Sequence, residues 1–196
     1  MSESNLKKKQ IISTAQALFW KYGMRRVSIE EICGVAKVSK MTFYKFFKNK
    51  IELVKYILDK IEEESTKEYQ TIMSQDISFH KKVLQTIDMK MKSVDKISSE
   101  FYADLHQNAI PEISEHFNNI STRVLDLIVD DYKKAQGKGE IRKDLKIEFI
   151  IYQLNKIFEM AGDANLIEMY DSPQDLIMEL TRFFFYGILP REIDAK

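Results

Sequence analysis

The chain has 196 residues, of which 44% are hydrophobic and 31% are charged, with six glycines, three prolines and a formal net charge of zero. So few glycines and prolines favour long helices with few tight turns, and therefore an all-α fold. The single cysteine, Cys33, excludes an internal disulfide and a cysteine-built zinc site, and we interpret it as a small core residue.

The first predicted element is a helix over residues 6–22, in which apolar residues recur at helical spacing and form one stripe. Gly23 is expected to end it. No apolar run follows the lysines at 7–9, and the longest late apolar run, Phe183–Leu189, is too short to span a bilayer. We therefore expect a cytoplasmic protein that has no membrane partner.

Three helix starts are predicted within the next 30 or so residues. Ser28 precedes a glutamate by three positions, the spacing of a capping box, in which both side chains bond to free backbone N–H groups. Ser39 provides a second N-cap, and Asn49, with Glu52 three positions on, provides a third. Short helices are thus expected from Ser28 and Ser39, and a longer helix from Asn49 through Ile61.

The remainder is predicted to form long amphipathic helices, with breaks near residues 75–78, Pro111, 137–139 and 171–173, giving about nine helices in all. The last two, which cover about 147–161 and 173–188, carry more apolar surface than one buried stripe requires. Two such helices from each of two subunits would form a four-helix interface, so we expect a homodimer through the last two helices.

Charge is divided unevenly along the chain. Residues 1–60 contain 13 Lys and Arg against 5 Asp and Glu, a net charge of +8, whereas residues 61–196 contain 17 against 25, a net charge of −8. This division is typical of a polyanion-binding module joined to a body that does not bind the polyanion. A chance run of solvated lysines would give the same sum, so the motifs must decide between the two interpretations.

Residues 27–53, VSIEEICGVAKVSKMTFYKFFKNKIEL, carry the most specific pattern of the chain. This segment resembles the helix-turn-helix of the TetR family of bacterial transcriptional regulators. The resemblance implies a three-helix DNA-binding domain over residues 1–50 and a larger helical effector-binding and dimerisation domain over 51–196. It further implies a dimer that binds a palindromic operator in double-stranded DNA, most often as a repressor released by an unknown small-molecule effector. It implies no cofactor and no enzyme activity.

Within the resemblance, Lys40 and Met41, followed by Lys45, match the positions that contact bases, and Thr42, Tyr44 and Lys50 match positions that hold phosphates. Phe43 and Phe47 are interpreted as core aromatics that pack the recognition helix onto Ile32 and Leu18. The residues expected to contact DNA are Ser28, Lys37, Ser39, Lys40, Met41, Thr42, Tyr44, Lys45, Lys48 and Lys50.

The segment departs from the family pattern at three positions. Lys37 stands where a glycine or another small residue is frequent in the turn, and Met41 replaces a frequent glycine in the recognition helix. Phe46 stands where histidine or tyrosine is common, which removes a polar contact to DNA. The operator sequence therefore does not follow from the resemblance.

Aromatic and methionine side chains of the helical body are expected to line an apolar effector pocket, although each is also a candidate for ordinary core. They are Phe101, Tyr102, Phe117, Tyr152, Phe158 and Met160.

The sequence nominates no catalytic or metal-binding residue. The histidines at 80, 106 and 116 lack metal-site spacing, and neither a glycine-rich phosphate loop nor a G-x-S-x-G motif occurs. Glu159 and Asp163 are interpreted as solvated or dimer-rim acids. Two alternatives stay open: an all-α enzyme whose basic segment binds an acidic partner, and a helical interaction protein that keeps the family fold without binding an operator.

Overall fold

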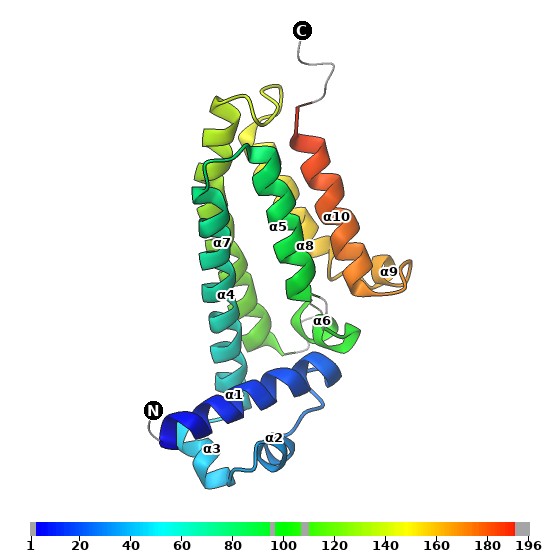
Figure 1. Cartoon of the computed structure of the whole chain (residues 1–196). Coiled ribbons are helices and arrows are strands. Elements are labelled where there is room, and N and C mark those ends of the chain that lie inside the picture. The colour runs from blue at the N-terminus through cyan, green and yellow to red at the C-terminus, as the bar shows by residue number, and fades with distance from the viewer. Residues whose placement is uncertain (1–2, 95–96, 107–109, 191–196) are drawn as a thin grey trace. The chain divides into compact units, whose positions relative to one another are not determined.

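The computed structural model describes residues 3–94, 97–106 and 110–190; the side chains of Val94, His106 and Phe158 lie outside this description. The described residues form ten α-helices and no β-strand, which confirms the predicted all-α fold (Figure 1). The helices are α1 (Glu3–Tyr22), α2 (Ile29–Val35), α3 (Lys40–Phe46), α4 (Lys50–Ser74), α5 (Phe79–Val94), α6 (Ser99–His106), α7 (Pro111–Gly137), α8 (Ile147–Met160), α9 (Ala164–Ile167) and α10 (Pro173–Ile188).

The chain divides into two compact units. The first comprises residues 1–62 and 96–118, and the second comprises residues 63–95 and 119–196. The long helices α4 and α7 each contribute one part to each unit, because the divisions fall within them.

The first unit is built around the apolar stripe of α1. Ile11, Ala15 and Phe19 are buried, and α1 packs against α2, α3 and α6. This confirms the stripe that the sequence predicts. Gly23 ends the helix in the left-handed region, with a φ of +79°, which glycine adopts without steric cost.

Side-chain caps set the starts of the next three helices, as the sequence predicts. The Ser28 Oγ accepts a hydrogen bond from the Glu31 N–H at 3.1 Å, and the Ser39 Oγ accepts one from the Thr42 N–H at 3.1 Å. Asn49 caps α4 through a 2.8 Å bond from the Glu52 N–H. These caps satisfy backbone donors that have no partner within their own helix, and they fix where α2, α3 and α4 begin.

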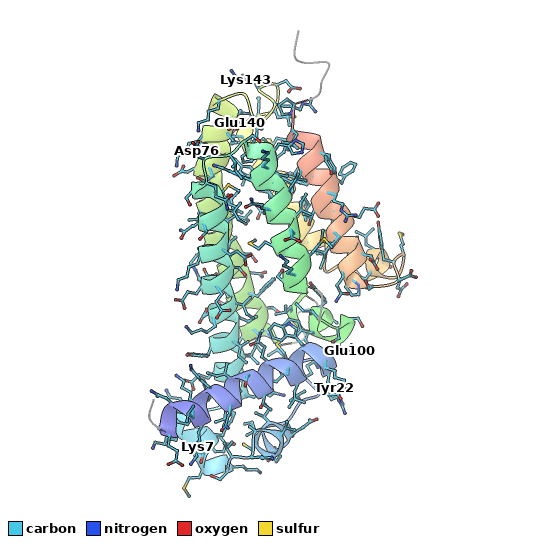
Figure 2. All side chains as sticks on the ribbon, in the orientation of Figure 1. Lys7, Tyr22, Asp76, Glu100, Glu140 and Lys143 are labelled. Carbon is cyan, nitrogen blue, oxygen red and sulfur yellow. The ribbon has the colours of Figure 1, made fainter. Side chains whose placement is uncertain are left out.

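The second unit has its own apolar core, in which α10 packs against α5 and α8. The Tyr132 ring lies edge-on to Phe79, with 5.7 Å between centroids, and stacks on Phe184 at 6.4 Å. Glu140, labelled in Figure 2, accepts a 2.8 Å hydrogen bond from the Phe79 N–H and so anchors the first turn of α5. Further buried core residues are Val83, Ile87, Ala135, Ile141, Ile150, Met178, Phe185, Ile188 and Leu189.

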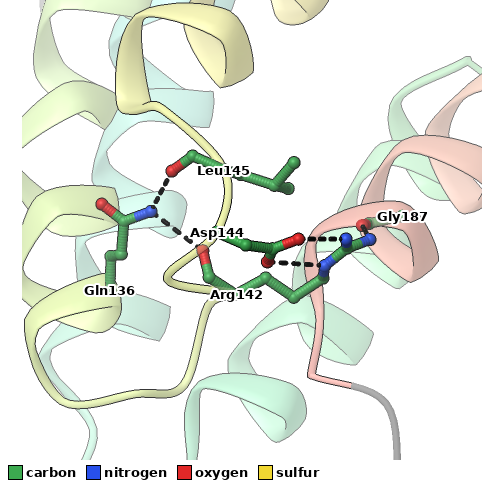
Figure 3. A network of polar contacts seen from close by, with 5 residues as sticks. All are labelled: Gln136, Arg142, Asp144, Leu145 and Gly187. Carbon is green, nitrogen blue, oxygen red and sulfur yellow. Dashed lines mark hydrogen bonds and ion pairs between the residues drawn. The ribbon is translucent and has the colours of Figure 1, made fainter. Parts of the chain in front are cut away.

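The segment between α7 and α8 is fixed by a polar network (Figure 3). The Gln136 Nε2 donates to the carbonyl oxygens of Arg142 at 2.9 Å and of Leu145 at 2.6 Å. The Arg142 guanidinium forms an ion pair with Asp144 and donates to the carbonyl oxygen of Gly187 at 3.2 Å. The network therefore ties the start of α8 to the end of α10.

The predicted helix breaks coincide with observed ones at the end of α4, the start and end of α7 and the start of α10. Two features were not predicted: α6 is a helix separate from α5, and α9 is a four-residue helix. Asp163, predicted to be a solvated or rim acid, caps α9 by accepting a 2.8 Å bond from the Asn165 N–H. A four-residue helix is too short to show helical periodicity in the sequence.

Across the described ranges, no helix has both the length and the apolar character that a bilayer span requires.

We expect Gln136→Met to lower the free energy of unfolding by about 1–3 kcal/mol, because two carbonyl groups lose their side-chain donor. Methionine and glutamine have similar helix propensities. Gln70→Met, at an exposed position of α4, is therefore the matched control and should change the value by less than about 0.5 kcal/mol. Urea denaturation at one fixed protein concentration measures both; equal effects would show that the network contributes nothing.

Candidate nucleic-acid interface

The turn between α2 and α3 is a Schellman motif with lysine where glycine is usual. The Val38 N–H donates to the Cys33 carbonyl at 3.0 Å and the Lys37 N–H donates to the Gly34 carbonyl at 3.3 Å. Lys37 itself has a φ of +53°, in the left-handed region. This geometry accounts for the small residue that the family pattern favours there. It also leaves the Lys37 side chain exposed beside the start of α3.

The recognition helix α3 has a buried face and an exposed face. Phe43 and Phe47 are buried, as expected for core aromatics, with ring centroids 5.9 Å apart. On the opposite face, Met41 is 84% exposed and Tyr44 is 53% exposed. Aromatic burial thus fixes the helix so that Met41 and Tyr44 point outward. A large apolar side chain exposed to this extent on a short helix is suited to contact a partner.

Exposed lysines surround this outward face. Lys37, Lys40, Lys45 and Lys48 all lie on the surface of the first unit. The Ser39 and Thr42 hydroxyls are hydrogen-bonded at 3.0 Å at the start of α3, and the hydroxyl that accepts this bond can donate to a phosphate oxygen. Eight of the ten predicted DNA-contacting residues, all between positions 37 and 48, therefore lie on α3 and its flanking turns, whereas Ser28 caps α2 and Lys50 begins α4. That these residues contact DNA stays a prediction.

Lys40 carries a partner that the sequence analysis did not predict. Its Nζ forms an ion pair with the Glu30 carboxylate on α2. The hydrogen bond from Lys40 lowers the pKa of Glu30, and the hydrogen bond to Glu30 raises the pKa of Lys40, so both groups are charged at neutral pH. No local pattern marks this pair, because residues ten positions apart meet only through the turn between α2 and α3.

Lys50, predicted to hold a phosphate, has a structural role within the first unit. Its Nζ donates to the carbonyl oxygens of Val27 at 2.8 Å and of Arg25 at 3.2 Å. Burial lowers the pKa of this half-buried ammonium, against an opposing contribution from Asp104. Lys50 thus binds the first turn of α4 to the loop that precedes α2.

The same loop is also held by α6. The buried Asp104 carboxylate accepts a 2.9 Å hydrogen bond from the Arg25 backbone N–H. A Cβ atom at Gly23 would lie 2.8 Å from the Asp104 Oδ2, so the close approach of α6 requires glycine there. Asp104 was also absent from the predicted site residues, since no local motif marks a contact 79 positions away.

Two further contacts join the end of α1 to α6. The Ser98 N–H donates to the Trp20 carbonyl at 2.9 Å, and the Trp20 and Phe101 rings lie 4.8 Å apart. Figure 2 labels Tyr22 at the end of α1 and Glu100 in the first turn of α6. Within the first unit, the helix-turn-helix is therefore fixed to both α4 and α6.

The residues expected to line an effector pocket fall into different environments. Phe101 and Tyr102 are buried in α6, and Phe117 is half-buried in the part of α7 that belongs to the first unit. In the second unit, Tyr152 is 56% exposed and Met160 is 37% exposed. The side chain of Phe158 lies outside the described residues. Phe101 and Tyr102 are core residues of the first unit, and the pocket stays a prediction.

The described residues offer little support for metal binding or for a reactive thiol. No group of three or more His, Cys, Asp or Glu is placed there to hold a metal ion. The side chain of His106 lies outside the described residues, and His116 bonds to Asp59 through Nε2 at 2.7 Å. Cys33 is buried, as expected of a core residue, and burial raises the pKa of its thiol, which disfavours the reactive thiolate.

A short helix with a basic outward face, presented by a tight turn and a buried aromatic core, defines the class of helix-turn-helix proteins. The family model described as "Bacterial regulatory proteins, tetR family" matches residues 11–57. The chain is also 26% identical to the transposon Tn10 TetC protein of Escherichia coli, over 91% of this chain and 76% of that protein.

Solved structures share the fold. TetR from Rhodobacter sphaeroides superposes with a TM-score of 0.75 at 16% identity, over 94% of this chain and 100% of that chain. FadR from Bacillus subtilis, in complex with stearoyl-CoA, gives a TM-score of 0.72 at 16% identity, over 92% and 99%. Residues 11–57 therefore carry the DNA-binding helix-turn-helix of the TetR family of bacterial regulatory proteins, a family of regulators rather than of enzymes.

The contact between Gly23 and α6 predicts opposite effects for two glycine substitutions. Gly23→Ala places a Cβ against Asp104 at a positive φ and should lower the free energy of unfolding by at least about 1 kcal/mol. Gly34→Ala, in helix α2 with no atom within 4 Å of the new Cβ, should raise it by up to about 1 kcal/mol. Thermal and urea unfolding measure the free energy of unfolding of both variants. An unchanged value for Gly23→Ala would contradict the close approach of α6 to Gly23.

Proposed function

We propose that the protein is a repressor that binds a palindromic operator as a homodimer and leaves it when a small-molecule effector binds. The outward face of α3 supports this proposal most directly. Its first residues, Lys40 and Met41, lie where a recognition helix approaches base edges in the major groove. The flanking lysines and hydroxyls are suited to phosphates, which set the position of the helix without specifying sequence.

Under this proposal residues 1–50 bind DNA, and residues 51–196 bind the effector and form the dimer. The exposed aromatic side chains of the second unit support the dimer. On α8, Phe149 is 50% exposed and Tyr152 is 56% exposed; on α10, Phe183 is 82% exposed and Tyr186 is 61% exposed. Each pair lies three residues apart, on the outward side of its helix. A second copy of the chain would bury both pairs in a four-helix interface.

The contacts around the 23–28 loop support a mechanism of release. Lys50 on α4 and Asp104 on α6 both bond to the backbone of this loop, so a shift of either helix would displace the loop and with it α2 and α3. Helix α4 lies almost entirely within residues 51–196, the part of the chain that would bind the effector. An effector that prefers the shifted arrangement would lower affinity for the operator, because the two states bind effector and DNA differently.

The chemistry of the effector is open within this proposal. The related fold of FadR from Bacillus subtilis contains stearoyl-CoA. The predicted pocket residues Phe101, Tyr102, Phe117, Tyr152, Phe158 and Met160 favour an apolar compound for this chain.

Selection from a random DNA pool at two salt concentrations tests the proposed function. We expect recovery of a palindrome whose half-sites lie about one helical turn, ~34 Å, apart, with affinity that falls steeply as salt rises. Recovery of no preferred sequence would contradict the proposal and favour a helical interaction protein or an all-α enzyme that retains the fold.

Two substitutions on α3 should separate base contacts from phosphate contacts. Tyr44→Ala should weaken binding to all operator variants by the same factor, because a phosphate contact carries no sequence information. Lys40→Ala should in addition reduce discrimination at one base pair of each half-site, by about five-fold or more. Titration of a set of single-base operator variants measures both. The assigned roles are wrong if the two substitutions change every variant equally.

We expect Phe183→Glu to convert the dimer to a monomer, since it places a charge on the apolar face of α10. Leu6→Glu, at a 49% exposed position of α1 in the first unit, provides a matched control that should stay dimeric. Sedimentation velocity without DNA distinguishes the two states. A dimeric Phe183→Glu variant would contradict the proposed interface.

A further inference from the structure

The Glu30–Lys40 ion pair joins the two helices of the helix-turn-helix at its outer surface. Glu30 lies in the first turn of α2, and Lys40 is the first residue of α3. Their side chains remain 62% and 54% exposed. Exposed pairs of this kind contribute little to fold stability, since water and salt screen them. Any function of the pair therefore depends on the hydrogen-bond donor and acceptor that its two charged groups offer to a binding partner.

A carboxylate is unexpected at this position on a DNA-binding surface. Residues 28–50 contain five lysines and two acids, Glu30 and Glu31. Only Glu30, of these two acids, has a described ion pair with α3. A carboxylate that lies beside the recognition helix and contacts no base would reduce affinity for DNA, because it repels phosphates. A carboxylate that accepts hydrogen bonds from a base would offset that repulsion.

The two groups have complementary hydrogen-bonding roles. The Lys40 ammonium only donates and the ionised Glu30 carboxylate only accepts. Their direct contact places a donor and an acceptor side by side, within one hydrogen-bond length of each other. A base pair presents a similar arrangement at its major-groove edge, where exocyclic groups of the two bases are themselves hydrogen-bonded.

A G·C pair fits this arrangement better than an A·T pair, because all three of its polar groups at the major-groove edge find a partner. Guanine offers two adjacent acceptors, N7 and O6, followed by the N4 amino donor of cytosine. An A·T pair instead presents the adenine N6 donor in place of guanine O6 and the thymine O4 acceptor in place of cytosine N4, with the methyl group beyond it. Lys40 would then keep only the N7 acceptor, and the carboxylate would lie beside the O4 acceptor, which repels it.

We propose that Glu30 and Lys40 act as one unit that recognises a single G·C pair in each half-site. Lys40 donates to guanine N7 and O6, and Glu30 accepts from cytosine N4. Glu30 on α2 is thereby a specificity-determining residue outside the recognition helix. This inference rests on the proposed function, because it requires α3 to enter the major groove.

The test uses the full-length chain and the operator recovered from the random pool. Glu30→Ala should reduce discrimination between G·C and the other base pairs at one position of each half-site by about five-fold or more. The dependence of affinity on salt should stay unchanged, because no phosphate contact is lost. Lys40→Ala should affect the same position, and the double variant should lose no more discrimination there than the greater of the two single losses.

Glu31→Ala is the matched control. This substitution removes the same negative charge one residue away, from a half-buried side chain. It should change the affinity for every DNA sequence by the same factor. If Glu30→Ala also raises or lowers affinity uniformly, the carboxylate acts only through repulsion or through holding Lys40, and the inference is overturned. If the wild-type chain selects no palindrome, the proposed function fails and the inference fails with it; a selected palindrome with unchanged preference in Glu30→Ala overturns the inference alone.

Discussion

Burial of Phe43 and Phe47 is the constraint on which the rest of the DNA-binding surface depends. Helix α3 has only seven residues and would not be stable in water by itself. The two aromatic side chains hold it against the core of the first unit, and Ser39 fixes where it begins. Met41 and Tyr44 then face outward because of the helical period. Buried side chains, which cannot reach DNA, therefore position the side chains that would contact it.

The position of this helix is set in turn by contacts that lie outside the motif. Lys50 and Asp104 bond to backbone groups of the 23–28 loop, and Gly23 allows α6 to approach that loop closely. Backbone groups held by buried or half-buried charges give a well-defined geometry, since each charge would otherwise lack a partner. The same contacts offer a physical route by which a displaced α4 or α6 would change the DNA-binding geometry.

Much of the first unit could be predicted from the sequence, because its helix starts and stops depend on neighbouring residues. The caps at Ser28, Ser39 and Asn49, the stop at Gly23 and the stripe on α1 depend on neighbouring residues, so a short window reveals them. The lysines and hydroxyls around α3 were predicted by a different route, the resemblance of residues 27–53 to the TetR family. Lys37 was recognised as a departure, and the structure supplies the reason, a φ of +53°.

Features that depend on distant residues could not be predicted. Asp104 meets Arg25 across 79 positions, and Glu30 meets Lys40 only after the turn is formed. The short helix α9 starts at a local aspartate cap, but it has too few residues for a periodic pattern. The predicted pocket residues were chosen by side-chain type alone, and the structure places them in buried, half-buried and exposed settings. Side-chain type without position does not define a cavity.

Whether α3 lies in the major groove is most directly tested by methylation protection on the recovered DNA. Dimethyl sulfate modifies guanine N7 in the major groove and adenine N3 in the minor groove. We expect bound protein to protect guanine N7 at two clusters about one helical turn, ~34 Å, apart, and to leave adenine N3 between them reactive. Protection confined to adenine N3, or reactive guanines throughout a bound site, would contradict this expectation.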